Sequence, residues 1–225
     1  MTPTSASLLP LDPAELRQAL ADRCVRTLYQ PIVRLADRCP VGIEVLARLA
    51  DATRGLLEPG AFVPGMEDAG LGRALFEAVI EAAFSDWHAA GIGALGLSLA
   101  INLPHDVLIE PASRRWLEDS RIRHAIPAGR IVIELTESQP LHRMAELVIA
   151  VAELRAWGYG LAIDDVGPDI RDHAPLLDLP FTILKLDRAL VQSIGRGGSP
   201  AFIRTVMASA RLAGLTVVAE GVENE

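Results

Sequence analysis

The chain alternates between short apolar runs and longer amphipathic stretches. The apolar runs are rich in β-branched residues and mostly continuous, which is typical of strands covered on both faces of a sheet. Between most of them, apolar residues recur with the spacing of a helix that has one buried face. The predicted strands are residues 26–35, 41–49, 95–103, 130–137, 159–166, 181–187 and 215–220.

Capping residues mark where the predicted helices begin and end. Asp12 and Pro13 suit the N-cap and first turn of a helix over residues 12–20. Other helices are predicted by their pattern over residues 72–91, 141–158 and 199–214. Glycines placed just before the next strand indicate helix C-caps; they are Gly91, Gly158 with Gly160, and Gly214.

The repeated order of strand, helix and strand predicts parallel strands joined by right-handed crossovers. The first two strands are the exception, because the linker 36–40 is too short for a crossover helix and predicts an antiparallel hairpin. A closed barrel of this class needs one strand more than the seven found here. We therefore expect an α/β fold, a TIM-like (β/α) barrel with an antiparallel first strand that lacks the last βα unit. Residues 1–12 are expected to be a disordered lead, and residues 13–225 one C-terminally incomplete barrel domain.

Composition and charge exclude several classes of protein. With a formal net charge of −8 and a sequence pI of about 5.2, the chain has no general basic surface for duplex nucleic acid. A small phosphodiester can still bind where metal ions offset the repulsion from carboxylates. Without a signal-peptide pattern or a run of about 18 apolar residues, we expect a cytoplasmic chain with no membrane span. Cys24 and Cys39 lack metal-ligand spacing and are interpreted as idle thiols.

Polar residues lie within the second apolar run and at the ends of the later ones. In a parallel barrel these carboxyl ends open onto the face where barrel enzymes carry out their chemistry, so we expect the side chains to converge. Burying so many acids without counter-ions would be very costly. The alternative is a solvated rim of strand ends. The residues are Glu44, Asn102, Glu134, Asp164, Asp165, Lys185 and Glu220.

Oxygen-rich clusters of this kind suit hard cations such as Mg²⁺, Mn²⁺ or Ca²⁺. The adjacent carboxylates of Asp164 and Asp165 can ligate two metal ions at once, which activates a water and steadies in-line displacement at phosphorus. Lys185 is interpreted as a charge neutraliser, as a group that orients water, or as a simple salt-bridge partner. A magnesium-dependent barrel lyase or isomerase with Lys185 as base is another hypothesis. The histidines form no catalytic or ligand pattern.

Seven motifs follow one another in order from about residue 14 to the end: YQPIV, GIEVLARL, INLP, IELTES, AIDDVG, LKLD and VVAEGVE. By this order and spacing the chain resembles the EAL domain family of bacterial signalling proteins. The resemblance implies hydrolysis of one phosphodiester of cyclic di-GMP to linear pGpG. It also implies Mg²⁺ or Mn²⁺ as cofactor, with two ions in active members, inhibition by Ca²⁺, and pairing as a homodimer.

The resemblance assigns roles to individual residues. Glu44 and Leu46 stand at the signature Glu-Ala-Leu, with Val45 in the middle position. Arg48 matches the arginine on a substrate phosphate and Gln30 the glutamine near a guanine, so Gln30, Leu46 and Arg48 form the implied substrate-binding set. The implied metal ligands are Glu44, Asn102, Glu134, Asp164, Asp165 and Glu220.

The same resemblance implies a catalytic set and a supporting residue. Lys185 matches the lysine beside the nucleophilic water, and Glu44, Asp165 and Glu220 complete the implied catalytic residues. Glu223 matches the glutamate that supports the loop following the Asp164–Asp165 pair.

The stretch 166–173 departs from the family pattern. Where the family reads DDFGTGYSSL, this chain has Pro168, Asp169, Arg171 and Asp172 in place of small, flexible residues. Pro168 stiffens the backbone at a mobile turn that couples dimerisation to metal and substrate binding in the family. The family's final strand, with a glutamine near a QG motif, falls beyond residue 225. Two hypotheses follow: a metal-dependent phosphodiesterase, or a cyclic di-GMP receptor or protein-interaction module that has lost turnover.

Overall fold

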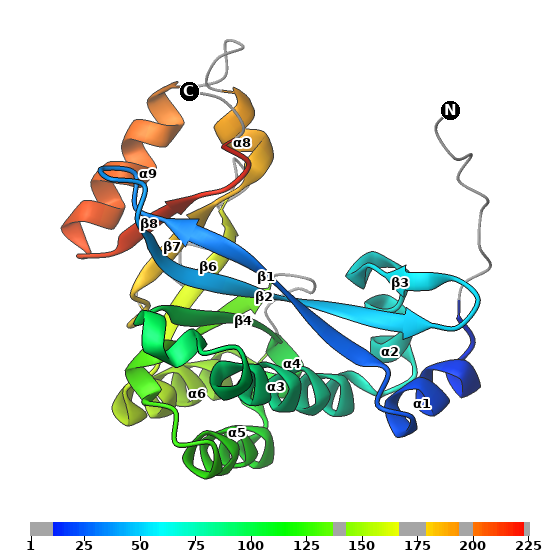
Figure 1. Ribbon diagram of the computed structural model, residues 1–225. Helices are drawn as coiled ribbons and strands as arrows, with labels where there is room; N and C mark the ends of the chain where they lie inside the picture. Colours follow the sequence, from blue (N-terminus) through cyan, green and yellow to red (C-terminus); the bar gives the residue numbers. More distant parts are fainter. Residues whose placement is uncertain (1–10, 137–142, 167–178, 194–199, 223–225) are drawn as a thin grey trace, which may run out of the picture. The chain divides into compact units, whose positions relative to one another are not determined.

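The computed structural model describes residues 11–136, 143–166, 179–193 and 200–222 (Figure 1). These residues form two compact units, one within Met1–Leu97 and one within Ser98–Glu225. Residues 1–10 of the predicted N-terminal lead lie outside the described part. No helix in the described ranges is both long enough and apolar enough to cross a membrane.

The first unit is built on an antiparallel hairpin, as the short linker predicts. β1 (Val25–Val33) pairs with β2 (Pro40–Asp51), and the register places Gln30 opposite Glu44. A third strand, β3 (Gly55–Leu57), pairs antiparallel with the end of β2. The sequence pattern missed β3 because a strand of this length contains too few residues to show a period.

Helices cover one face of this hairpin. Asp12 caps α1 (Pro13–Ala21) in a capping box with Glu15, which confirms the predicted helix start. α3 (Gly72–Ala89) packs against β1 (Figure 1), and its buried residues include Ile80 and Phe84. Shorter elements connect them: η1 (Pro59–Ala61), α2 (Val63–Asp68) and η2 (Ile92–Leu95).

The second unit is a parallel sheet whose strands run side by side in chain order (Figure 1). Apolar residues fill these strands, and most are fully buried, as the continuous runs predict. The strands are β4 (Ser98–Pro104), β5 (Ile131–Thr136), β6 (Gly160–Val166), β7 (Ile183–Leu186) and β8 (Thr216–Ala219). The connecting elements are α4 (His105–Ile109), α5 (Pro111–Arg123), η3 (Ala128–Arg130), α6 (Met144–Trp157), α8 (Arg188–Ser193) and α9 (Pro200–Leu212).

Three of the four predicted cap glycines have the left-handed backbone that such caps require. Gly91, Gly158 and Gly214 all have φ between +68° and +97°. Gly160 was wrongly predicted as part of a cap, because it is the first residue of β6. Space is tight there, because a Cβ would lie 3.0 Å from Cγ2 of Val132 on the neighbouring strand.

Candidate functional site

A bulge in β6 presents Asp164 and Asp165 at the carboxyl edge of the second unit's sheet. Ile163 pairs with Leu184 and Val166 with Leu186, so β6 uses one more residue than β7 over this interval. Asp165 has φ of +53°, a left-handed conformation that is uncommon outside glycine but tolerated by aspartate. In a regular strand, consecutive side chains point to opposite faces. The bulge instead lets two neighbouring carboxylates serve one site.

Lys185, on β7, lies at the centre of this edge. Its side chain is 2% exposed, and Nζ is 3.0 Å from Oε2 of Glu134, 3.0 Å from Oδ1 of Asp164 and 2.8 Å from Oε1 of Glu220. A buried ammonium is costly unless it is paired and hydrogen-bonded. Three carboxylates from three different strand ends meet that requirement. Of the interpretations offered for Lys185, charge neutralisation and salt-bridge pairing both have direct structural support, whereas the orientation of a water stays a prediction.

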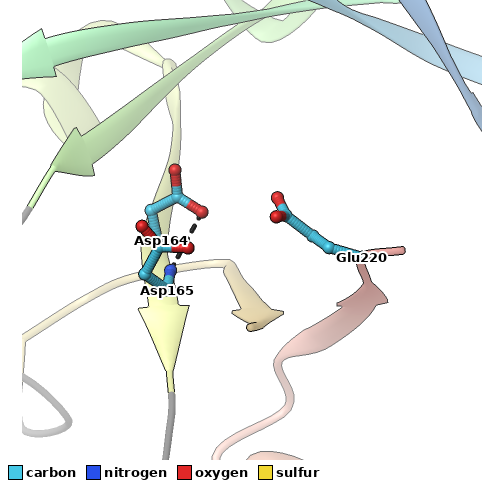
Figure 2. Close-up of side chains that lie close together, drawn as sticks. All are labelled: Asp164, Asp165 and Glu220. Carbon is cyan, nitrogen blue, oxygen red and sulfur yellow. Dashed lines mark hydrogen bonds between the residues drawn. The ribbon is translucent and has the colours of Figure 1, made fainter. Parts of the chain in front are cut away.

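Asp164, Asp165 and Glu220 have the chemistry of a divalent-cation site. One carboxylate oxygen from each lies within 4.8 Å of the others. Figure 2 shows Glu220 reaching from the end of β8 toward Asp164, whose Oδ1 accepts a hydrogen bond from the backbone N–H of Asp165 at 3.0 Å. Clustered carboxylate oxygens are the donors that Mg²⁺, Mn²⁺ and Ca²⁺ prefer. The residues present therefore fit the metal that the sequence implies.

The electrostatics of this cluster favour binding a cation. The pKa of Asp165 is raised to about 6, first because the surrounding protein removes part of its water, and then because Asp164, Glu220 and Asp187 repel its charge. Lys185 acts in the opposite direction but does not cancel these effects. Asp165 is nevertheless exposed, so a cation can reach it from solvent. A bound cation would relieve the repulsion.

Asn102 and Glu134 lie side by side on the two preceding strands. They are paired in the parallel register of β4 and β5. Asn102 is half-buried, whereas Glu134 is 1% exposed and accepts a hydrogen bond from Lys185 at 3.0 Å. Printed contacts thus bring together Glu134, Asp164, Asp165, Lys185 and Glu220, and Asn102 is in register with Glu134.

The remaining predicted residues gather on one face of the β1–β2 hairpin. Directly opposite residues of an antiparallel pair have side chains on the same face, and residues two apart along a strand share it. Gln30 is opposite Glu44, Leu28 opposite Leu46, and Arg26 opposite Arg48. All three β1 members of these pairs are exposed, and all three β2 members are half-buried. The hairpin thus brings together the predicted substrate residues Gln30, Leu46 and Arg48, and adds Glu44 to the same face.

The opposite face of the hairpin is fixed to α3 by hydrogen bonds. Asp86 on α3 accepts hydrogen bonds on Oδ2 from the hydroxyls of Thr27 (2.9 Å) and Tyr29 (2.6 Å). Burial and the Asp86 carboxylate raise the pKa of Tyr29 well above its ordinary value, so Tyr29 stays a donor. These contacts hold the strand that carries Gln30.

Replacing Asp86 with alanine is expected to lower the free energy of unfolding by about 1–2 kcal/mol, because two partly buried hydroxyls lose their acceptor. Asp86→Asn, which keeps one acceptor oxygen, should lose less. Urea denaturation measures both; an Asp86→Ala chain as stable as wild type would show that the network does not hold the hairpin. The exposed variant Asp22→Ala controls for the loss of a carboxylate.

Two parts of the prediction fall outside the described residues: Glu223, and Pro168–Asp172 with the rest of the altered loop after Val166. Sequence reasoning missed Asp187, which contributes to the repulsion on Asp165. Its position at the end of a predicted strand was the available signal. It also missed Arg26 and Leu28, which only the register of the hairpin identifies.

Parallel strands whose carboxyl edge carries an acidic cluster around a buried lysine define an α/β protein with a metal-competent site. The EAL domain family matches residues 14–225, and this chain belongs to that family. The phosphodiesterase PaMucR, solved as a complex with c-di-GMP, superposes with a TM-score of 0.85 at 29% identity, over 94% of this chain and 87% of that one. This similarity confirms the predicted α/β, TIM-like barrel with an antiparallel first strand.

Sequence relatives point the same way. MucR of Pseudomonas aeruginosa, a bifunctional diguanylate cyclase/cyclic di-GMP phosphodiesterase, is 30% identical over 94% of this chain and 31% of its own length. An uncharacterized signaling protein of Caulobacter vibrioides is 33% identical over 94% of this chain and 26% of its own length. The FimX EAL domain from Pseudomonas aeruginosa, bound to c-di-GMP, shares the fold at a TM-score of 0.83 and 20% identity, over 95% of this chain and 87% of that one. The chain thus spans about a third or less of the length of the two curated relatives, MucR and the Caulobacter vibrioides protein.

Proposed function

We propose that this chain is a metal-dependent phosphodiesterase that hydrolyses cyclic di-GMP to linear pGpG. The observation that carries the proposal is the strand-end cluster, in which a bulge presents two adjacent carboxylates and Glu220 beside a buried, triply paired lysine. The similarity to cyclic di-GMP phosphodiesterases supports the choice of substrate. Site chemistry, rather than the fold, supports the choice of reaction.

Within this proposal, Asp164, Asp165 and Glu220 hold Mg²⁺ or Mn²⁺, and Asn102, Glu134 and Glu44 are further candidate ligands. A cation held there would supply a positive centre that could activate a water and stabilise the negative charge that develops on the phosphate oxygens. The bulge in β6 sets the backbone positions of Asp164 and Asp165. Their two carboxylates are therefore held close to each other by the strand itself. Lys185 keeps the carboxylates in place through its three ion pairs, and it would orient the attacking water once one of its three N–H groups exchanged a carboxylate for that water.

The open face of the hairpin supplies the substrate contacts. Arg48 is proposed to bind a phosphate, because a guanidinium donates two parallel hydrogen bonds to phosphate oxygens. Gln30 is proposed to read a guanine edge, since its amide both donates and accepts. Leu46 lies between these positions and offers an apolar surface to the nucleotide.

The second candidate function is a cyclic di-GMP receptor that has lost turnover. It is favoured by one observation, the replacement of small residues by Pro168, Asp169, Arg171 and Asp172 in a loop that the family keeps flexible. Such a receptor would keep the nucleotide contacts of the hairpin while hydrolysis fails. A homodimer is proposed for either function.

The decisive experiment is hydrolysis of cyclic di-GMP with Mn²⁺ or Mg²⁺, followed by the appearance of pGpG. Wild type and Asp119→Asn, which removes an exposed carboxylate on α5, are expected to form product, whereas EDTA abolishes it. Asp164→Asn is expected to lose turnover at least about a hundredfold, because a buried ligand oxygen becomes an amide. Metal-independent product would contradict the proposal; nucleotide binding without product would favour the receptor.

A further inference from the structure

Two arginines face each other across the open side of the β1–β2 hairpin. Arg26 on β1 is directly opposite Arg48 on β2, and such pairs have Cβ atoms about 5 Å apart. Arg26 is exposed and Arg48 half-buried, so both can be reached from solvent. The pair comes from adjacent strands of one hairpin within the first unit, and its geometry depends on that unit alone.

Neither guanidinium has an acidic partner within the described ranges. Nη1 of Arg26 donates to the backbone carbonyls of Arg23 (2.6 Å) and Val25 (2.9 Å), and Nη1 of Arg48 donates to that of Ala47 (2.8 Å). Their Nε and Nη2 groups have no acceptor among the described residues. Acidic residues outnumber lysine and arginine by 29 to 21, and several other arginines form ion pairs: Arg34, Arg54, Arg73, Arg114, Arg121 and Arg143.

Like charges directly opposite each other in a sheet repel and destabilise it. An anion that accepts hydrogen bonds from both guanidinium groups replaces this repulsion with attraction. The backbone carbonyls fix one nitrogen of each guanidinium and leave the others available. The neighbouring pairs on the same face are apolar, Leu28 with Leu46, and then polar, Gln30 with Glu44. The face therefore changes from cationic to apolar to polar along the hairpin, as a ligand with a phosphate, a sugar and a base would require.

We infer that Arg26 supplies a second guanidinium to the phosphodiester that Arg48 binds. This inference rests on the proposed function, because it takes cyclic di-GMP as the ligand of this face. Two guanidinium groups converging on one phosphodiester can satisfy both non-bridging oxygens, which a single arginine does only in one orientation. Arg26 is thus a substrate-binding residue, and its contribution is to affinity rather than to the chemical step.

Binding of cyclic di-GMP to the whole chain is measured by calorimetry, with Ca²⁺ replacing Mg²⁺ to prevent turnover. Arg26→Gln is expected to weaken binding about tenfold, the size of one charge-assisted hydrogen bond. Arg26→Lys should give an intermediate affinity, since it keeps the charge but loses the planar pair of donors. Arg17→Gln on α1 removes another exposed arginine of the same unit and should bind as wild type.

Two further results separate binding from a structural role. The Arg26→Gln, Arg48→Gln double variant should lose less affinity than the two single losses combined, because both side chains act on one phosphate. The difference between wild type and Arg26→Gln should shrink at high salt. Weakened binding in Arg48→Gln with wild-type affinity in Arg26→Gln would overturn the role of Arg26 and leave the proposed function intact. A wild-type chain that binds no cyclic di-GMP would overturn the proposed function, and this inference with it.

Discussion

Replacing Lys185 with methionine is expected to abolish turnover and to destabilise the metal-free chain more than any other single change in the site. Methionine fills a similar volume, so the packing of β7 is kept and the lost charge is what the variant tests. The side chain is 2% exposed and contacts three carboxylates, from Glu134, Asp164 and Glu220. Removing one partner from a buried charge cluster typically costs about 3–5 kcal/mol, because the remaining charges are left uncompensated. For a chain of this size, such a loss in the free energy of unfolding lowers Tm by roughly 10 °C.

Thermal unfolding in EDTA and pGpG formation in Mn²⁺ measure the two effects. Adding Glu134→Gln to Lys185→Met should restore part of the stability, since one buried negative charge is removed, but should restore no turnover. Mn²⁺ should raise Tm more in Lys185→Met than in wild type, because the ion replaces the missing positive charge. Wild-type stability and turnover in Lys185→Met would show that Lys185 is neither counter-ion nor catalytic group.

Much of this site could be predicted from the sequence, because strands that are buried on both faces require continuous runs of apolar residues. Continuous apolar runs locate the strands, and the ends of parallel strands must share one edge, so Glu134, Lys185 and Glu220 could be placed together in advance. The helix start at Asp12 was equally predictable, because a capping box is a local arrangement.

Features that depend on strand pairing could not be predicted. A regular β6 would send Asp164 and Asp165 to opposite faces, and only the register against β7 shows the bulge that unites them. The facing of Arg26 and Arg48 depends likewise on the register of the hairpin, which no local pattern fixes. The requirement for glycine at Gly160 has the same origin, since it is set by Val132 on a neighbouring strand.

The hairpin face and the strand-end cluster each carry an electrostatic imbalance, and the two imbalances have opposite signs. Arg26 and Arg48 on the hairpin face have no acidic partner among the residues that the structure describes, and the strand ends hold more carboxylate than Lys185 neutralises. Each imbalance disfavours the ligand-free chain and is relieved by a group of opposite charge, a phosphodiester in one case and a divalent cation in the other. Binding energy and folding stability should therefore be coupled at this site.

Asp165→Asn tests that coupling most directly, because stability and activity are expected to change in opposite directions. Asparagine tolerates the left-handed backbone at this position, so the bulge is kept. The pKa of Asp165 is about 6 in the folded chain against an ordinary value of 3.8, so the folded state binds more protons between these values. The free energy of unfolding of the metal-free wild type should then fall as pH rises through that window. The Asp165→Asn chain should not show this fall, because asparagine does not titrate.

In EDTA at pH 8, Asp165→Asn should therefore be more stable than wild type, by about 1 kcal/mol after allowing for solvent screening of an exposed group, or roughly 3 °C in Tm. The gain should shrink as the pH falls through that window and vanish at about pH 3 or below, where the carboxyl is mostly protonated in both states. In saturating Mn²⁺ the order should invert, because only wild type keeps the full ligand set, and turnover of the variant should fall at least about a hundredfold. Asp119→Asn should show neither effect. An Asp165→Asn chain no more stable than wild type in EDTA at pH 8 would mean that the cluster is not under the repulsion that makes it a cation site.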